Sequence, residues 1–215
     1  MGIQIVKKGH RAERSAAEFN EIARTIFLPV YPVIARQAVA CCGFDRGFCI
    51  DAGCGPGHLA LALAAVSGFR IDALDTSTEM LACARKNIQN AGMSGRIRTV
   101  QGDVHALPYA DCSADLVMSR GSIFFWESPA KAFREIYRVL KPGGRSFVGG
   151  GFGSPELKAA IIATMRESDP SWEEMMMQNM GRTKDAEIRQ ALNEACITDA
   201  EIRRDDSGFW VVMRK

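Results

Sequence analysis

The 215-residue sequence has no apolar run of the roughly 18 residues that a membrane-spanning helix requires. Residues 1–10 contain lysines but neither a long apolar core nor a small-residue cleavage site, so they do not resemble a signal peptide. Neither sign of charge is in large excess, because the chain has 27 basic and 25 acidic residues, and it has no basic tail. Since nucleic-acid binding favours a clustered basic surface, we expect a soluble, cytoplasmic protein without nucleic-acid or membrane partners.

The residue spacings typical of a metal site are also missing. Seven cysteines occur without a Cys-x-x-Cys pair, and the three histidines are scattered along the chain. A zinc site is therefore not expected, and Cys49 and Cys83 are interpreted as small packing residues. No Ser-His-Asp or Cys-His arrangement for nucleophilic catalysis is evident.

Hydrophobic residues, by contrast, make up 47% of the chain, which is enough for one domain with a sizeable core. We predict a single domain over residues 1–215. It divides into an N-terminal helical segment over about 1–44, a central core over 45–153, and C-terminal helices with a hairpin over 154–215.

The central feature is a glycine turn between an apolar segment and a run of helix-forming residues. Residues 48–52 are apolar around Asp51, glycine follows at positions 53, 55 and 57, and residues 59–65 contain only leucine and alanine. This order predicts a buried strand, a tight turn and a helix of a doubly wound α/β fold. Glycine permits a positive φ and a close approach to a ligand, and the helix start offers unpaired N–H groups.

The rest of the chain alternates between helical and strand patterns. Further strands are predicted over residues 70–74, 96–101, 115–119 and 145–148, followed by an antiparallel hairpin over 197–203 and 209–213. Helices are predicted to begin at the capping residues Ser15, Thr76, Ser128, Ser154 and Thr183. Another helix is predicted over residues 33–42, with Tyr31 held before it in a rigid bend between Pro29 and Pro32.

Two acids and a second glycine turn sharpen this interpretation. Asp75 closes the second predicted strand, Asp103 follows the third, and residues 140–144 read Leu-Lys-Pro-Gly-Gly before the fifth. Together with the acid-x-Gly-x-Gly-x-Gly run over 51–57, these motifs resemble the class I S-adenosylmethionine-dependent methyltransferases. Within that family the chain resembles the small-molecule, quinone-biosynthesis-like group.

The resemblance implies S-adenosyl-L-methionine as the cofactor and a Rossmann-like, seven-stranded, mostly parallel sheet with helices on both faces and an antiparallel C-terminal hairpin. It also implies that the two N-terminal helices form a lid, although plain packing on the sheet is an equal alternative. Asp75 would bind the ribose hydroxyls and Asp103 would lie beside the adenine amine. The expected cofactor-binding residues are Tyr31, Asp51, Gly53, Cys54, Gly55, Gly57, Asp75, Thr76, Met80, Gly102, Asp103, Val104 and Arg120.

The loop over residues 120–127 combines three aromatic residues with one arginine and one glutamate. Because ligands of open α/β sheets bind beyond the carboxyl ends of the strands, we expect this loop and Tyr31 to form the pocket of a small, partly apolar methyl acceptor. Tyr31, Arg120 and Trp126 are the positioning candidates, and Arg120 could bind a carboxylate of the acceptor or of the cofactor. No catalytic base is assigned, because in-line methyl transfer can proceed by positioning.

Other functions stay open. An RNA or protein methyltransferase is disfavoured by the even charge, and residues 119–122 lack the Asn/Asp-Pro-Pro-Tyr/Phe run of enzymes that methylate planar amino groups. A nicotinamide-dependent oxidoreductase would read Gly-x-Gly-x-x-Gly, whereas residue 58 is histidine and Gly57 comes one place early. A metalloid methyltransferase would use thiols as ligands. A cofactor-binding protein without turnover would carry the same motifs.

We expect S-adenosylmethionine and S-adenosylhomocysteine to bind this protein, and NAD not to bind. A ligand at ~100 times its Kd stabilises the native state by roughly 2.7 kcal/mol, which a thermal unfolding curve resolves. A curve shifted by NAD and unmoved by either adenosyl compound would contradict the interpretation of the glycine turn.

Overall fold

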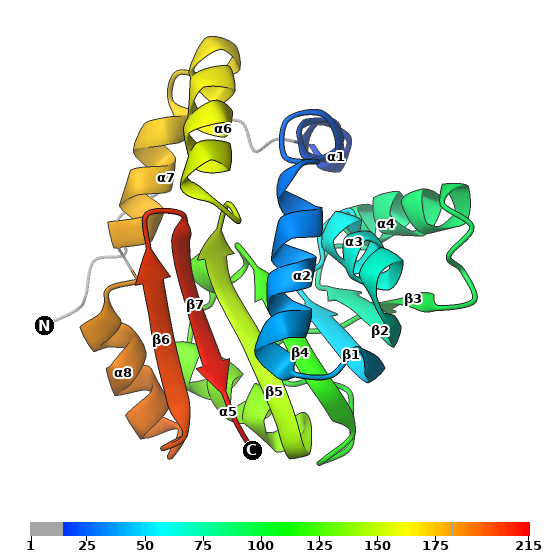
Figure 1. The fold of residues 1–215 in the computed structure, drawn as a ribbon, viewed down its shortest axis with the longest axis vertical. Coiled ribbons are helices and arrows are strands. Elements are labelled where there is room, and N and C mark those ends of the chain that lie inside the picture. The colour runs from blue at the N-terminus through cyan, green and yellow to red at the C-terminus, as the bar shows by residue number, and fades with distance from the viewer. Residues whose placement is uncertain (1–14, 182) are drawn as a thin grey trace, which may run out of the picture.

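A computed structural model describes residues 15–181 and 183–215 of the chain, so the prediction about residues 1–10 lies outside the described residues. A seven-stranded sheet runs through this part of the protein, with helices packed on both faces (Figure 1). The strands are β1 (Arg46–Ala52), β2 (Gly68–Asp75), β3 (Ile97–Gln101), β4 (Ala114–Arg120), β5 (Leu140–Gly151), β6 (Ala200–Asp205) and β7 (Gly208–Met213). The helices are α1 (Ala16–Thr25), α2 (Val30–Cys42), α3 (His58–Val66), α4 (Thr78–Asn90), α5 (Pro129–Val139), α6 (Pro155–Ser168), α7 (Trp172–Gly181) and α8 (Asp185–Glu194), with a 3₁₀ turn η1 (Ile123–Phe125).

The strand order is β3-β2-β1-β4-β5-β7-β6. Strands β1 to β5 pair in parallel, whereas β7 pairs antiparallel with both β5 and β6. The predicted fold class is confirmed, including the closing hairpin. The carboxyl ends of β1, β2 and β4 therefore meet at one edge of the sheet, where ligands of such folds bind.

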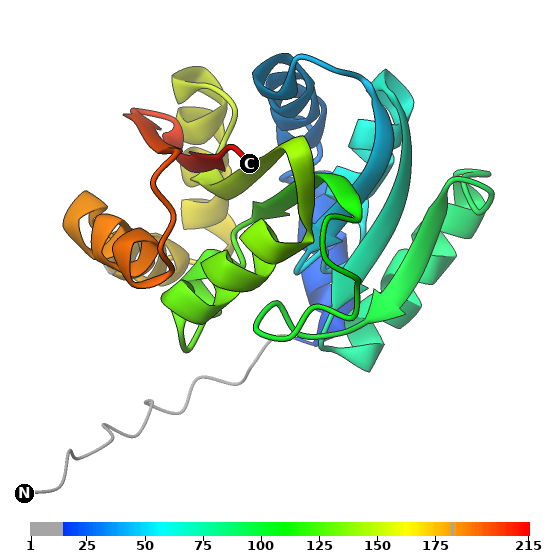
Figure 2. The same cartoon turned by 90° about the horizontal axis from the view of Figure 1, so that it is seen from below.

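Two hydrophobic clusters cover the two faces of the sheet. Helices α2, α3 and α4 pack on one face around Ile34, Leu63 and Phe69, and α5 and α8 pack on the other around Phe133 and Phe209. Figure 2 shows α5 beside α8 on one side of the sheet and α2 on the other. Strands β1 and β4 are buried on both faces, as their continuous apolar sequences predict.

Several helix starts agree with the sequence, and others are displaced. Ser15 forms the predicted capping box with Glu18, and Ser154 accepts the Leu157 N–H. Ser128 occupies the N-cap position without a side-chain hydrogen bond.

Two predicted caps are wrong by one residue. Ser77, and not Thr76, caps α4, because its Oγ accepts the Met80 N–H at 3.2 Å. Lys184, and not Thr183, is the N-cap residue of α8. In both places the helix starts one residue later than the spacing of polar residues indicates.

The predicted bend around Tyr31 is also wrong. Helix α2 begins at Val30, so Tyr31 lies in its first turn, with Pro29 as the N-cap residue. Prolines are tolerated there because the first N–H groups of a helix have no intrahelical partner.

The Leu-Lys-Pro-Gly-Gly motif does not precede β5 but forms its beginning. Leu140 pairs with Ala114, and the register between β4 and β5 shifts between Ala114 and Leu116. The next pair is Leu116 with Arg145, so residues 141–144 lie in this irregularity without a partner in β4. Lys141 donates to Asp115 Oδ2 there at 2.8 Å.

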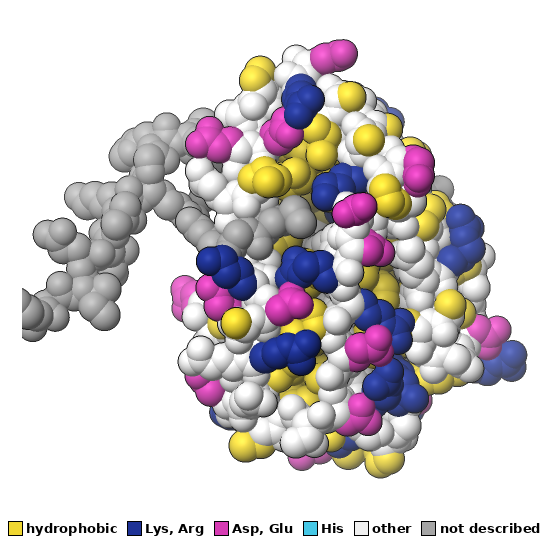
Figure 3. Space-filling view, turned by 60° about the vertical axis from the view of Figure 1, so that its left-hand side comes forward, with side chains coloured by type: hydrophobic (Ala, Val, Ile, Leu, Met, Phe, Trp, Pro, Cys, Tyr) yellow, Lys and Arg dark blue, Asp and Glu magenta, His cyan; other side chains and the backbone are white. Residues whose placement is uncertain are grey.

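Among the described residues, no single helix is long and apolar enough to cross a membrane. The pair α1 and α2, bent by 79°, meets the requirement by length and composition alone. On the face in Figure 3, basic and acidic side chains are interspersed, in keeping with ion pairs such as Arg203–Glu201 and Arg204–Asp185.

Gly149→Ala is expected to destabilise the protein by roughly 1–3 kcal/mol, because a Cβ at this position would overlap the Phe209 carbonyl in the neighbouring strand. Gly95→Ala is the control, since a Cβ there meets nothing within 4 Å. Urea unfolding measures both variants. Equal stability of the two would show that β7 does not approach β5 as closely as described.

Candidate active site

The glycine turn after β1 is hydrogen-bonded to the end of β2. Gly53 N donates to Leu74 O at 2.8 Å, and Gly55 N donates to the Oδ2 atom of Asp75 at 2.8 Å. Gly53, Gly55 and Gly57 have φ values of 75°, 52° and 81°, which residues with a Cβ rarely adopt. The sequence therefore places three glycines where the backbone must turn sharply at the carboxyl edge of the sheet.

The same turn is packed closely from two sides. A Cβ on Gly53 would overlap the Ser122 side chain, which comes from the segment after β4. A Cβ on Gly55 would lie 3.6 Å from the Phe19 ring of α1. Helix α1 thus lies next to the turn, while the Ser122 side chain contacts it from the segment after β4.

Asp51, in β1 just before the turn, is a buried carboxylate without a full set of partners. It is 1% exposed, and its Oδ2 atom has no hydrogen-bond partner in the described part of the chain. Burial, together with the negative charge of Asp75, raises the pKa of Asp51 to about 7. The residue is therefore well placed to accept a hydrogen bond from a cationic group.

Asp75 is held in a fixed orientation at the end of β2. Its Oδ1 accepts the Ser77 N–H at 3.0 Å, and its Oδ2 accepts the Gly55 N–H. A carboxylate can accept about four hydrogen bonds, so each oxygen keeps capacity for a further donor.

Asp103 lies one strand further out and pairs with His105. Its Oδ1 accepts the backbone N–H of His105 at 2.9 Å and faces the His105 Nδ1 at 2.7 Å. The Ser128 N–H donates to the other ring nitrogen, Nε2, at 3.3 Å. The backbone hydrogen bond from His105 lowers the pKa of Asp103 most. His105 therefore links Asp103 to the N-terminus of α5.

Arg120 ends β4 inside an aromatic cage. Its guanidinium carbon lies 5.1, 5.6 and 5.7 Å from the ring centroids of Phe27, Tyr31 and Phe152. The Nε atom donates to Gly151 O at 2.9 Å, and no described carboxylate pairs with this arginine. Burial lowers its pKa, but a guanidinium stays protonated in proteins, so the cage holds a cation with several N–H groups free.

Tyr31 connects the arginine with the turn. Its ring stacks on His58 at a centroid distance of 5.6 Å, and His58 Nε2 lies 2.8 Å from the Asn20 Oδ1. Burial raises the pKa of Tyr31, opposed by the Arg120 charge and reinforced by Asp51. Tyr31, Asp51 and Arg120 are thus brought together, with the phenol protonated.

Trp126 is not brought into this group. Its ring lies on the α5 side of the sheet, 5.7 Å from Phe133, and its Nε1 donates to Ser122 Oγ at 3.1 Å. Phe124 packs against Phe209 on the same side, and Phe125 is 71% exposed. The loop predicted as one acceptor pocket is therefore divided between the two faces of the sheet, and Trp126 reaches the turn only through Ser122.

The remaining candidates line the same edge of the sheet. Cys54 is buried in the turn, with Sγ 3.4 Å from Gly55 O. Thr76 is exposed and Met80 is half-buried near the start of α4, and Val104 is buried beside Asp103. Gly102 packs so closely on Leu74 that a Cβ would approach its side chain to 2.9 Å.

Three aromatic residues of the site were not anticipated from the sequence. Phe27 stacks on Phe152 at 6.2 Å, and Trp172 of α7 meets both edge-on. From the sequence, Phe27 reads only as part of the apolar face of the helix that begins after Ser15, and Trp172 only as part of a short helix. The glycine run before Phe152 is the one local signal that this segment approaches other backbone closely.

Comparisons with known proteins agree with this geometry. Residues 50–148 match the model of the family described as a methyltransferase domain. A solved structure of a proposed S-adenosyl-L-methionine-dependent methyltransferase from Methanococcus maripaludis is 45% identical, with a TM-score of 0.90, and the match covers 100% of this chain and 97% of that one. A structure of a SAM-dependent methyltransferase from Aquifex aeolicus, 15% identical, shares the fold at a TM-score of 0.67 over 94% of this chain and 98% of that chain.

The UbiE ubiquinone/menaquinone biosynthesis C-methyltransferase of Klebsiella pneumoniae is 30% identical over 157 residues, or 68% of this chain. The match spans 62% of that relative, so this chain covers less than two-thirds of the length of such curated relatives. The chain belongs to the S-adenosyl-L-methionine-dependent methyltransferase family. The resemblance and the cofactor predicted from the glycine turn are thereby confirmed.

Asp51→Asn is expected to stabilise the ligand-free protein relative to wild type at pH 8 but not at pH 4. The folded-state pKa of about 7 lies above the ordinary 3.8, so the folded protein binds this proton more tightly than the unfolded chain. Stability from this group is present at low pH and is lost as the pH rises between those two values. Across that pH range the free energy of unfolding of the wild-type protein falls by on the order of 4 kcal/mol.

Urea unfolding of both proteins from pH 4 to pH 8 measures this difference. A gap between variant and wild type that does not change with pH would contradict the raised pKa.

Proposed function

We propose that the protein transfers the methyl group of S-adenosyl-L-methionine to a small, partly apolar molecule. The observation that carries this proposal is that two groups of opposite charge lie at the carboxyl edge of the sheet: the buried Asp51, with one oxygen unpartnered in the described chain, and the half-buried Arg120, with which no described carboxylate pairs. An α-amino acid presents an ammonium and a carboxylate on one carbon, so a site that binds it needs an acceptor and a cationic donor side by side. Asp51 Oδ2 would accept from the ammonium, and the free N–H groups of Arg120 would bind the carboxylate.

The remaining cofactor residues fit the adenosine part. Asp75 has both oxygens oriented by backbone N–H groups, which leaves lone pairs for the two ribose hydroxyls. Asp103 uses Oδ1 for His105 and would offer Oδ2 to the adenine amine. The glycines allow close backbone approach, and Cys54, Thr76, Met80, Gly102 and Val104 would line the same crevice.

The acceptor would lie beside the aromatic residues Phe27, Phe152 and Trp172, between α1 and α6. Bound S-adenosyl-L-methionine supplies a methyl group already activated by its positive sulfur. The chain then has to position the acceptor and exclude water. Tyr31 would donate a hydrogen bond, because its raised pKa keeps the phenol protonated. The relationship to ubiquinone/menaquinone C-methyltransferases supports a small acceptor with an apolar ring.

The role of Arg120 is tested with Arg120→Gln and the control Arg46→Gln, an exposed arginine at the start of β1. If Arg120 binds the cofactor carboxylate, calorimetry should show roughly ten- to hundred-fold weaker S-adenosylhomocysteine binding. Arg46→Gln should bind as wild type does. Unchanged cofactor affinity with reduced turnover would assign Arg120 to the acceptor instead, and no effect on either would remove it from the site.

The function itself is tested by release of S-adenosylhomocysteine, followed by mass spectrometry, when quinols and small phenols are supplied as acceptors. We expect release with a small acceptor and none with RNA or protein. Release only with a macromolecule would overturn the proposed substrate class.

A further inference from the structure

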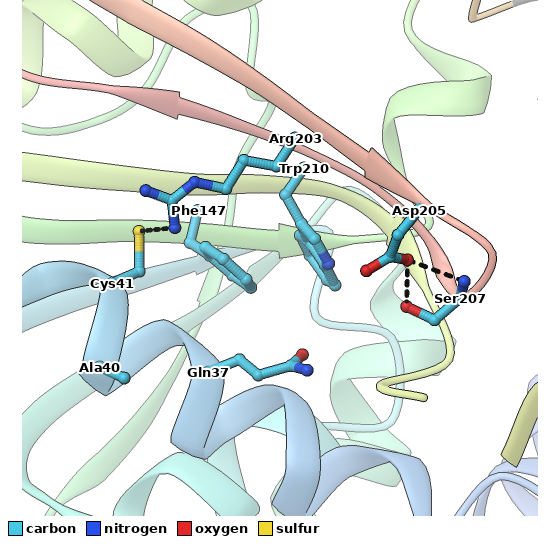
Figure 4. Close-up of a pocket in the computed structure, with 8 residues that line it drawn as sticks. All are labelled: Gln37, Ala40, Cys41, Phe147, Arg203, Asp205, Ser207 and Trp210. Carbon is cyan, nitrogen blue, oxygen red and sulfur yellow. Dashed lines mark hydrogen bonds between the residues drawn. The ribbon is translucent and has the colours of Figure 1, made fainter. Parts of the chain in front are cut away.

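A second pocket, with a volume of about 410 Å³, lies away from the glycine turn between α2 and the antiparallel part of the sheet (Figure 4). In Figure 1, α2 lies beside β5, and none of the labelled helices lies over β6 and β7 on the viewer's side. Its lining comes from α2, β5, β6, β7 and the hairpin turn, and consists of Gln37, Ala40, Cys41, Phe147, Arg203, Asp205, Ser207 and Trp210.

The sheet side of this pocket is aromatic. Phe147 and Trp210 stack with ring centroids 4.1 Å apart and an interplanar angle of 17°. Both rings are nearly buried, so they form a rigid wall. The indole N–H of Trp210 has no hydrogen-bond acceptor within the described chain.

Gln37 brings an unsatisfied acceptor to the opposite side. Its Nε2 donates to Gly153 O at 2.8 Å, which fixes the orientation of the amide. Its Oε1 is buried without a partner among the described residues, and Figure 4 shows this oxygen turned toward the space below Trp210. A buried acceptor without a donor is unfavourable, and a ligand N–H would satisfy it.

Asp205 adds a negative charge at the end of the pocket. Its Oδ1 accepts from the backbone N–H and the hydroxyl of Ser207 at 2.8 and 2.6 Å, and Figure 4 shows the other oxygen facing Trp210. The Ser207 hydroxyl bond is the main reason that the pKa of Asp205 is lowered. The nearby Arg203 is engaged by Glu201 at 2.9 Å, so its charge is already balanced.

We propose that this pocket binds a small, planar nitrogen heterocycle with N–H donors, at a site separate from the cofactor crevice. The ring packs against Phe147 and Trp210, and its N–H groups donate to Gln37 Oε1 and to the Asp205 oxygen that faces Trp210. The volume lies within the range of small-molecule sites, which are apolar pockets with a few fixed polar groups.

The test follows the indole N–H resonances of the ¹⁵N-labelled protein while 2-aminobenzimidazole is added, with and without saturating S-adenosylhomocysteine. We expect the Trp210 resonance, assigned by its loss in Trp210→Phe, to shift saturably in both conditions. Asp205→Asn should weaken binding roughly ten-fold or more, because a hydrogen bond to a charged group is lost. Asp206→Asn, the same charge change on the neighbouring residue, should leave affinity unchanged. Benzothiazole, which is planar but lacks N–H donors, should bind more weakly.

Absence of a Trp210 shift, or equal affinities for the Asp205→Asn and Asp206→Asn variants, would overturn the proposal. Displacement of 2-aminobenzimidazole by S-adenosylhomocysteine would also overturn it, since the compound would then occupy the cofactor crevice. The titration without S-adenosylhomocysteine is independent of the methyl-transfer proposal, so the two can fail separately.

Discussion

The site depends on two ionisable groups of opposite sign, the buried Asp51 and the half-buried Arg120, for which the described chain supplies no ion-pair partner. Asp51 lies in β1 and Arg120 ends β4, and these adjacent parallel strands are in register, with Asp51 opposite Met118. Asp51 is enclosed in β1, and the Nε of Arg120 is held by Gly151 O. Ionising Asp51 in the empty site is costly, which is why its pKa is raised to about 7, and a ligand ammonium would offset that cost on binding. The free-energy cost that the ligand-free site carries is removed when the ligand binds, so it adds to the affinity.

The end of β5 links the elements around this site. The Gly151 carbonyl accepts a hydrogen bond from the Nε of Arg120, and the Gly153 carbonyl accepts one from the side-chain amide of Gln37 in α2. Trp210 of β7 packs so closely on Gly151 that a Cβ there would lie 3.0 Å from its ring. The glycine-rich segment is therefore where the N-terminal helices, the parallel sheet and the C-terminal hairpin meet, and it separates the cofactor crevice from the second pocket.

The fold could be predicted because its signals are local: short apolar strands, a glycine turn and acids at strand ends. Helix starts were less certain where neighbouring residues compete to cap, as with Thr76 and Ser77. The acids of the site were readable because they follow strands directly. The aromatic cage was not, because Phe27 and Phe152 lie far apart in the sequence and meet only through α2 and β5. Nor does the local sequence show on which face of the sheet Trp126 packs, since its ring meets Phe133 of α5 only in the folded protein.

The position of β7 between β5 and β6 also constrains the order of folding. Strand β6 precedes β7 in the chain but pairs only with β7 among the described strands. It therefore cannot join the sheet before β7 has formed. Because the hairpin contacts are local and the β5–β7 contacts are not, we expect the hairpin to close first and to dock on β5 afterwards. Until then β5 is an open edge, the kind of surface that recruits foreign strands. Its glycines at positions 149–151 offer a partner strand backbone hydrogen bonds but almost no side chain, so the register at this edge is weakly specified until β7 is in place.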